Sequence, residues 1–453
     1  MRYLLAALVL VSAAAAGAAE REFRGKRVPI HFPPHSQWIA GHPVHRLGTE
    51  LRLGGVSFPV AEEKGEVLVG VVPGGEPLVR IGAGKPVRFA WTEAGAKREA
   101  LLAFARDDGG TWTFWAAEAV RFSIDGEVLR LYDADADGRY GDLARDGWSA
   151  GDADQVLPLA KQIPLGPLLL GIRSIDPDGG RIVAETAPLP GTKPQVAALV
   201  RLNRLRTANG LPPALLDVGL SAACTAHASY LALHGWNGRS NPHGQDLGPA
   251  GASAEGLAAA RRSVISPNRP ETTIDDCWRT FYHRVGLMGA ALDRIGVNED
   301  PPDLAVVDVG RGFGEGDEAA RAAGDEDVVQ PKVPEWPWAE PVLVPADGSA
   351  GFPVAAGPEL PKEPVPSLGS RGTPIMALFR EGTEVAGFAG TLEEFRGTAA
   401  VALPVLVADP GDFPSARGLV PARPLRAGTL HRATFTWRSG GKECRRTVRF
   451  TTE

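Results

Sequence analysis

The sequence predicts a multidomain α+β protein in which a central helical region lies between two β-rich flanks. Helical periodicity is confined to residues 195–314. Both flanks alternate short apolar runs with turns rich in glycine and proline, of which the chain has 55 and 39. The length of 453 residues also exceeds what a single hydrophobic core usually supports. We therefore expect three domains.

The first 19 residues, 1–19, have the pattern of an export signal. Arg2 supplies the positive charge, residues 3–11 form a short apolar core, and Ala16-Gly17-Ala18 offers a cleavage site with small side chains. No later stretch has the roughly 18 uninterrupted apolar residues of a transmembrane segment. We expect a secreted protein, either extracellular or in the periplasm or cell envelope. The net charge of −6 gives no reason to expect nucleic acid as a partner.

The N-terminal domain, residues 20–187, reads as all-β. Its apolar runs, such as GEVLVGVV, PVRFAW, TWTFWAA and EVLRLYDA, are short and are separated by turn residues. No segment holds a helical period for long. The stretch PLPGTKP, residues 188–194, has the composition of a linker to the central domain.

An acidic loop in this domain begins like the calcium loop of an EF-hand. It places aspartates at alternating positions and then Gly138, which lets the chain turn sharply. Ala144 stands where such a loop normally has its bidentate Glu, so a later Asp would have to take that role. The alternative is an acidic turn between strands without an ion. The candidate calcium ligands are Asp133, Asp135, Asp137, Asp142 and Asp146.

The central domain, residues 195–314, should contain four helices and a buried strand. Polar residues and glycines mark the expected helix ends. The first helix should start near Gln195 and end at Gly210, and the second should run from a cap at Asp217 to Gly235. Ser253 should begin the third helix and Thr273 should cap the fourth. The strand should cover residues 303–310.

A connector at residues 315–340 leads to a C-terminal β-sandwich at residues 341–453. Near its end, Ala433, Phe435 and Trp437 alternate with polar residues, which predicts a strand with one buried face. Ser439-Gly440-Gly441 then predicts a hairpin turn into a last strand. This pattern resembles bacterial immunoglobulin-like or fibronectin type III-like modules.

Three short elements of the central domain occur in a familiar order. They are the loop His243-Gly-Gln-Asp246, Glu255 on the third helix, and Trp278 followed by His283-Arg284. This order resembles the bacterial, SCP-like extracellular type of the CAP superfamily (cysteine-rich secretory proteins, antigen 5 and pathogenesis-related proteins). The resemblance implies an α-β-α sandwich whose central cavity is lined by His243, Glu255 and His283.

Two imidazoles and a carboxylate would suit zinc, with one coordination position left open. A polar cavity that holds water and fastens the surrounding loops is the alternative. Cys224 and Cys277 lie on the apolar faces of two predicted helices of this exported domain. They could form a disulfide or remain two buried free thiols.

The sequence leaves three classes of function open, and the first is the one we expect. It is a non-catalytic extracellular binding or adhesion-type module, with an envelope component, a lipid or a protein as partner. The second is a metal-dependent hydrolase that uses His243, Glu255 and His283, and the third is a carrier of lipids or small molecules. No catalytic residue is assigned, because the serines of the domain lack a Gly-x-Ser-x-Gly motif. These are Ser221, Ser229, Ser240, Ser253 and Ser263.

Overall fold

The structure is a computed structural model of the whole chain. It describes residues 19–30, 45–63, 66–70, 78–81, 85–106, 110–143, 145–151, 155–235, 242–313, 341–359, 363–366, 370–380, 382–411 and 413–453. The predicted signal, except for Ala19, and the connector at residues 315–340 lie outside the described residues. Among the described helices, none is long and apolar enough to cross a membrane.

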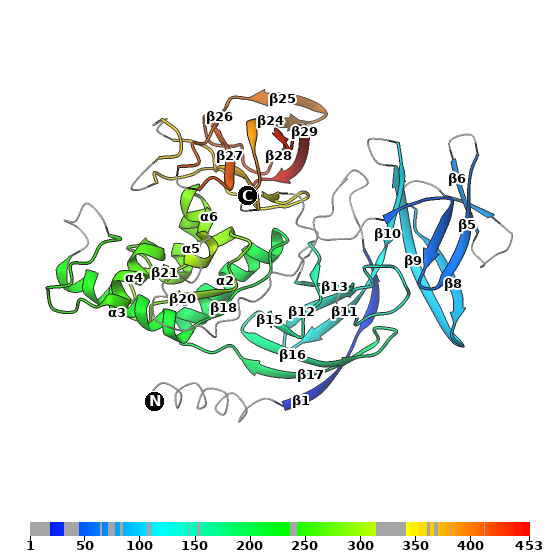
Figure 1. Cartoon of the computed structure of the whole chain (residues 1–453), viewed down its shortest axis with the longest axis horizontal. Coiled ribbons are helices and arrows are strands. Elements are labelled where there is room, and N and C mark those ends of the chain that lie inside the picture. Colours follow the sequence, from blue (N-terminus) through cyan, green and yellow to red (C-terminus); the bar gives the residue numbers. More distant parts are fainter. Residues whose placement is uncertain are drawn as a thin grey trace. The chain divides into compact units, whose positions relative to one another are not determined.

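The chain divides into two compact units, Met1–Leu189 and Pro190–Glu453. The described residues form several antiparallel sheets, with helices confined to the first half of the second unit (Figure 1). The predicted multidomain α+β class is confirmed at this level. The boundary between the units falls within the predicted linker at residues 188–194, because strand β17 (Arg181–Pro188) ends there and helix α2 (Lys193–Ala208) begins there.

One pair of sheets in the first unit encloses an apolar core built around Phe122, Trp148 and Ile182. Both sheets include strands from the start and from the later part of this unit, so segments far apart in the sequence pair with each other. The first sheet has the order β1 (Ala19–Arg24), β17, β16 (Leu168–Ile175) and β15 (Gln162–Leu165). The second has the order β14 (Leu157–Pro158), β13 (Gly147–Ala150), β12 (Glu127–Tyr132), β11 (Glu118–Ile124) and β2 (Lys26–Pro29).

A second pair of sheets in the same unit encloses a separate core that includes Phe58, Phe89 and Phe104. Their rings meet edge-on or tilted, as in the contact of 5.4 Å between the ring centroids of Phe58 and Phe89. One sheet has the order β4 (Glu50–Leu53), β5 (Val56–Glu63), β6 (Glu66–Gly70) and β7 (Leu78–Ile81). The other has the order β3 (His45–Arg46), β10 (Trp112–Ala116), β9 (Ala96–Arg106) and β8 (Val87–Glu93).

The second unit begins with the central helices. They are α2, α3 (Val218–His234), α4 (Ala254–Arg262), α5 (Pro270–Trp278) and α6 (Tyr282–Met288). The small sheet beside them has the order β18 (Leu215–Leu216), β20 (Arg294–Val297), β21 (Ala305–Asp308) and β19 (Ser263–Ser266). The predicted strand at residues 303–310 is therefore confirmed as β21, and the short 3₁₀ helix η2 (Gly310–Phe313) follows it.

Local capping signals placed most helix ends correctly. The Asp217 side chain accepts the Leu220 N–H at the start of α3, Gly235 ends that helix with a φ of 73°, and the Ser253 side chain accepts the Gly256 N–H. The predicted cap at Thr273 is wrong. Helix α5 begins after Arg269, with proline as its first residue, because proline already has a helical φ and needs no N–H acceptor there.

The rest of the second unit holds two further sheets. One has the order β22 (Val342–Val344), β23 (Ile375–Leu378), β27 (Ala416–Pro421) and β26 (Val405–Val407), and the other β25 (Ala399–Leu403), β24 (Ala386–Arg396), β28 (Leu430–Ser439) and β29 (Lys442–Thr451). The predicted hairpin is confirmed between β28 and β29. Ala433, Phe435 and Trp437 are buried as predicted, and Trp437 meets Phe379 with 5.3 Å between ring centroids.

Candidate functional sites

The aspartate loop, residues 133–146, connects β12 to β13 in the first unit. Ala136 of this loop is fully buried in the core that contains Phe58, and His45 Nε2 bonds to the carbonyl of Ala134 at 3.0 Å. Gly138 has a φ of +74°, and a side chain there would meet the Trp91 ring at 2.9 Å. The loop thus joins the strands of one core to the other core of the same unit.

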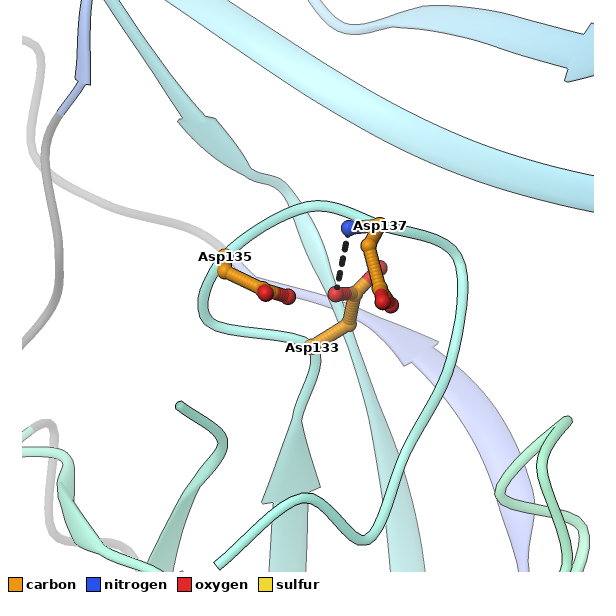
Figure 2. A group of neighbouring side chains, drawn as sticks. All are labelled: Asp133, Asp135 and Asp137. Atoms are coloured by element: carbon orange, nitrogen blue, oxygen red, sulfur yellow. Dashed lines mark hydrogen bonds between the residues drawn. The ribbon is translucent and has the colours of Figure 1, made fainter. Parts of the chain in front are cut away.

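The first three aspartates point toward one another inside the curve of the loop (Figure 2). Asp133, Asp135 and Asp137 each offer a carboxylate oxygen, and these oxygens all lie within 4.8 Å of one another. Within the described ranges, no other trio of acidic, histidine or cysteine side chains is this close. The alternating spacing that predicted a shared site has therefore brought these three predicted ligands together.

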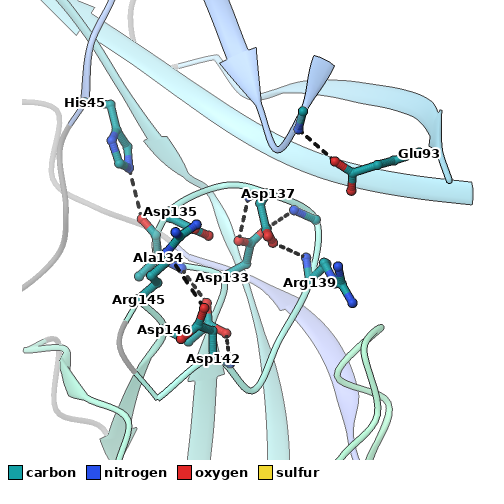
Figure 3. Close-up of polar contacts among 12 residues, drawn as sticks. His45, Glu93, Asp133, Ala134, Asp135, Asp137, Arg139, Asp142, Arg145 and Asp146 are labelled. Carbon is teal, nitrogen blue, oxygen red and sulfur yellow. Dashed lines mark hydrogen bonds and ion pairs between the residues drawn. The ribbon is translucent and has the colours of Figure 1, made fainter. Parts of the chain in front are cut away.

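Backbone N–H groups hold part of this arrangement in place (Figure 3). Asp133 accepts the Asp137 N–H at 3.0 Å and the Gly138 N–H at 2.8 Å. The buried Asp146 accepts the N–H groups of Ala134 at 3.3 Å and Asp142 at 2.8 Å. These bonds close the loop without an ion, and they leave lone pairs on both carboxylates for a further contact.

The other predicted ligands take different positions. Asp146 is 2% exposed and its charge acts on Asp133, so it lies beside the trio. Asp142 is half-exposed, and its carboxylate lies 3.8 Å from Arg145 Nε. The Arg145 Nη1 also approaches Asp135 Oδ2 at 3.4 Å, while Asp135 Oδ1 has no hydrogen-bond partner among the described residues. Asp135 therefore keeps one buried oxygen that no donor among the described residues satisfies.

The electrostatics of the loop favour a bound cation. Burial, followed by repulsion from Asp146 and Asp137, raises the pKa of Asp133 well above its usual value. Burial also raises the pKa of Asp146 to about 7, and the charges of Asp135 and Asp137 add to this effect. A divalent cation among these oxygens would relieve the repulsion. The trio could hold a metal such as calcium, which prefers oxygen ligands.

The second candidate site is in the other unit, where His283 on α6 faces a buried glutamate. Its Nδ1 lies 3.0 Å from Glu359 Oε1 and 3.1 Å from Thr280 Oγ1. The side chain of His283 is 20% exposed, whereas that of Glu359 is 0% exposed. Sequence reasoning missed Glu359, because it follows His283 by 76 residues and belongs to no motif. No local pattern in the chain signals this pairing.

Two further histidines of this unit, His243 and His227, are linked to His283 by successive electrostatic effects. A protonated His283 would lower the pKa of His243, and His243 in turn lowers that of His227, although burial is the main cause in both. His243 Nδ1 bonds to the Ala260 carbonyl at 2.9 Å, and His227 Nε2 bonds to the Pro242 carbonyl at 2.9 Å. We call His227, His243 and His283 the histidine cluster.

Glu255, the third residue predicted to line the cavity, makes no contact with these histidines among the described residues. Glu255 is exposed in the first turn of α4. Cys224 and Cys277 are free, buried thiols in the structure and do not form a disulfide with each other. Burial raises the pKa of both thiols, which keeps them protonated and unreactive at neutral pH.

Acid should destabilise the second unit through His227. This side chain is fully buried, and its Nε2 bonds to the Pro242 carbonyl at 2.9 Å. Burial lowers its pKa below the usual value of about 6.5, so the stability it contributes is complete above that pH and is lost as the pH falls below it. His227→Gln, which keeps an N–H donor, should reduce this loss by up to about 1.4 kcal/mol per pH unit.

Urea unfolding at pH 7 and pH 5 measures this difference. His234→Gln is the matched control, because His234 lies on the same helix α3 but is only half-buried. The control should keep the pH dependence of the wild-type protein. An equal loss of stability in wild type and His227→Gln would assign the acid sensitivity to other groups.

Comparisons with known proteins give little further guidance. No protein-family model and no curated protein matches the chain. A structural match exists to the crystal structure of selenomethionine PcoC, a copper resistance protein from Escherichia coli. It covers 24% of this chain and 95% of that one, with 19% sequence identity and a TM-score of 0.18. A score this low supports no conclusion about fold or about copper.

Proposed function

We propose that the protein is an exported, non-catalytic binding module of the CAP type, with an extracellular ligand bound at the histidine cluster. A structural calcium ion in the aspartate loop would stabilise the N-terminal unit. The binding role is supported by the electrostatic effect of His283 on His243, two of the three residues that the CAP resemblance assigns to one cavity. They come from the loop after α3 and from α6, so only a specific fold brings them together.

The hydrogen bonds of nearby serines favour binding over turnover. The Ser221 hydroxyl donates to the Asp217 carbonyl at 2.7 Å and accepts the Val297 N–H, and the Ser263 hydroxyl donates to the Ala259 carbonyl at 2.7 Å. Ser253 caps α4. These hydroxyls hold the backbone in place, and none has an imidazole as its hydrogen-bond partner, as an activated nucleophile would.

The hydrolase alternative requires zinc at His243 and His283 and a carboxylate that acts as base. Glu255, the residue that the resemblance offers for this role, is exposed and makes no described contact with either histidine. A carrier of lipids would need a long apolar groove, whereas the described surroundings of His283 are polar, with Thr280 and Glu359 at its ring. Binding of a polar extracellular ligand, such as an envelope component, therefore has the better support.

The proposed calcium has a structural role, because its loop is tied to both cores of the N-terminal unit. Ala136 is buried in one core, and β12 and β13 on either side of the loop belong to the sheet that covers the other. An ion held by Asp133, Asp135 and Asp137, with Asp146 close by, would fix the loop between them. Such an ion would act on stability and not on the ligand of the second unit.

A substrate screen tests binding against hydrolysis. Peptide, ester and glycan substrates should show only background turnover with the wild-type protein, with or without added zinc. His243→Ala and His283→Ala should leave that background unchanged, as should the control His234→Ala, because His234 bonds to the Ala250 carbonyl and contacts the Tyr230 ring. Turnover that chelation abolishes, and that both cluster variants lack but the control keeps, would replace the binding role with the hydrolase alternative.

A further inference from the structure

Glu359 lies at the boundary between the helices and the C-terminal sheets of the second unit. Its Oε2 accepts the Phe281 N–H at 2.9 Å, and its Oε1 accepts the His283 N–H at 2.9 Å. Both donors are at the start of α6, where backbone N–H groups have no partner within the helix. A residue distant in sequence thus satisfies the first turn of the helix that bears His283.

The same carboxylate also contacts the imidazole. His283 Nδ1 faces Glu359 Oε1 at 3.0 Å and Thr280 Oγ1 at 3.1 Å. The Thr280 hydroxyl donates to the Cys277 carbonyl at 3.1 Å, so its oxygen acts as an acceptor toward the ring. Two acceptors around Nδ1 require that this nitrogen carries the proton. The lone pair of the neutral ring is then on Nε2, at the opposite edge.

The charge of Glu359 is compensated from the helical side. Arg284 is fully buried, and its positive charge acts on Glu359. The Arg284 guanidinium donates to the carbonyls of Trp278 and Pro374 and lies over the Trp278 ring, 4.7 Å from its centroid. The charge of Glu359 also acts on Cys277, and that of His283 acts on His243. The Glu359 carboxylate is therefore part of a buried network of hydrogen bonds and charges with His283 and Phe281.

We propose that Glu359 is the positioning residue of the histidine cluster, and that it holds His283 in the tautomer with the proton on Nδ1, so that Nε2 receives the ligand. His243 has the same polarity, because its Nδ1 faces the acceptor oxygen of Ala260. The site is then assembled from two parts of the second unit: the loop after α3 and helix α6 supply the imidazoles, and the C-terminal part supplies the carboxylate that orients one of them. Carboxylates that hold a ligating histidine in this way typically strengthen metal binding by 10–100-fold.

This inference rests on the proposed function, because it takes the histidine cluster as the ligand site. Nitrogen-15 NMR of the side chains measures the tautomer directly in the full chain without any ligand. The chain has nine histidines, and His283→Gln identifies the relevant signals. At pH 8, His283 of the wild type should show a protonated Nδ1 and an unprotonated Nε2. The reverse pattern in the wild type would overturn the proposal without any variant.

Glu359→Gln then removes the charge and keeps one of the two acceptor oxygens, so one of the N–H groups of Phe281 and His283 keeps its acceptor. The His283 signals should shift to a mixture with a large share of the Nε2-protonated tautomer, while urea unfolding shows the protein still folded. Glu393→Gln is the matched control, because Glu393 pairs with Arg432 elsewhere in the same unit. A His283 tautomer that stays unchanged in Glu359→Gln would show that Thr280 alone sets it, and would reject the role of Glu359.

Zinc titration separates this inference from the proposed function. If zinc binds the wild type through the two Nε2 atoms, Glu359→Gln should weaken it by about 10–100-fold and Glu393→Gln should not. Equal zinc affinity in wild type and Glu359→Gln would contradict the positioning role. If zinc does not bind, the NMR measurement of the His283 tautomer alone tests the role of Glu359. Zinc-dependent turnover in the substrate screen would reject the non-catalytic binding role, but not the role of Glu359.

Discussion

Chelation of calcium should lower the melting temperature of the N-terminal unit by roughly 5–10 °C. An ion that binds only the folded state stabilises it by about 2.7 kcal/mol at a hundredfold excess over its dissociation constant. For a unit of this size, each kcal/mol corresponds to about 2–4 °C. The physical cause is the repulsion among the buried carboxylates of the aspartate loop, which returns when the ion leaves. Differential scanning calorimetry with and without chelator measures the shift.

Variants locate the ion. Asp135→Ala should abolish the response to chelator, because it removes the carboxylate whose inward oxygen has no described protein partner. Asp142→Asn should keep most of the response, since Asp142 lies outside the trio of close oxygens. Asp125→Asn is the control in a turn of the same unit, where the carboxylate pairs with Arg21. Identical melting curves with and without chelator would eliminate the calcium proposal.

Arg206→Met should destabilise the second unit by about 3–5 kcal/mol, because each buried carbonyl that loses its donor costs about 1–3 kcal/mol. Arg206 on α2 is fully buried and donates to four carbonyl oxygens. They belong to Pro212 at 2.8 Å, Leu287 at 2.7 Å, Gly289 at 3.1 Å and Leu292 at 2.9 Å. Without the guanidinium these carbonyls lose their donor in an apolar setting.

The expected loss should appear in urea unfolding at neutral pH. Arg204→Met, the same substitution on an exposed position of the same helix, should change stability by less than about 0.5 kcal/mol. Because Leu287 belongs to α6, the Arg206 variant should also loosen the helix that carries His283. Comparable stability of the two variants would mean that water replaces the lost donor. Arg206 would then not stabilise the packing of α2 against the segment at the end of α6.

Features that depend on a few neighbouring residues could be predicted from the sequence. Asp217, Gly235 and Ser253 end or begin helices as expected, because capping needs only a side chain within three residues of the N–H it satisfies. The hairpin between β28 and β29 follows from its two glycines. The alternating aspartates of residues 133–137 also converge as their spacing predicted, since one tight loop contains them all.

The break between α5 and α6 was not predictable in the same way. The sequence predicts four helices, the last of them capped at Thr273, yet the structure has a fifth that starts at Tyr282. The carboxylate of Glu359 satisfies the freed N–H groups of Phe281 and His283. Two hydrogen bonds between residues 78 and 76 apart thus compensate for the lost helical bonds, and local helix propensity cannot predict them.

The sequence by itself determined the order of the β-rich and helical regions, most helix ends, and the aspartate trio, because each depends on local backbone preference and side-chain period. Only the tertiary structure decided which carboxylate faces His283, and that Glu255 stays exposed on α4. A buried charge requires a partner within a few ångströms. Which distant residue meets that requirement is settled by the packing of the C-terminal sheets against the helices, and not by any pattern along the chain.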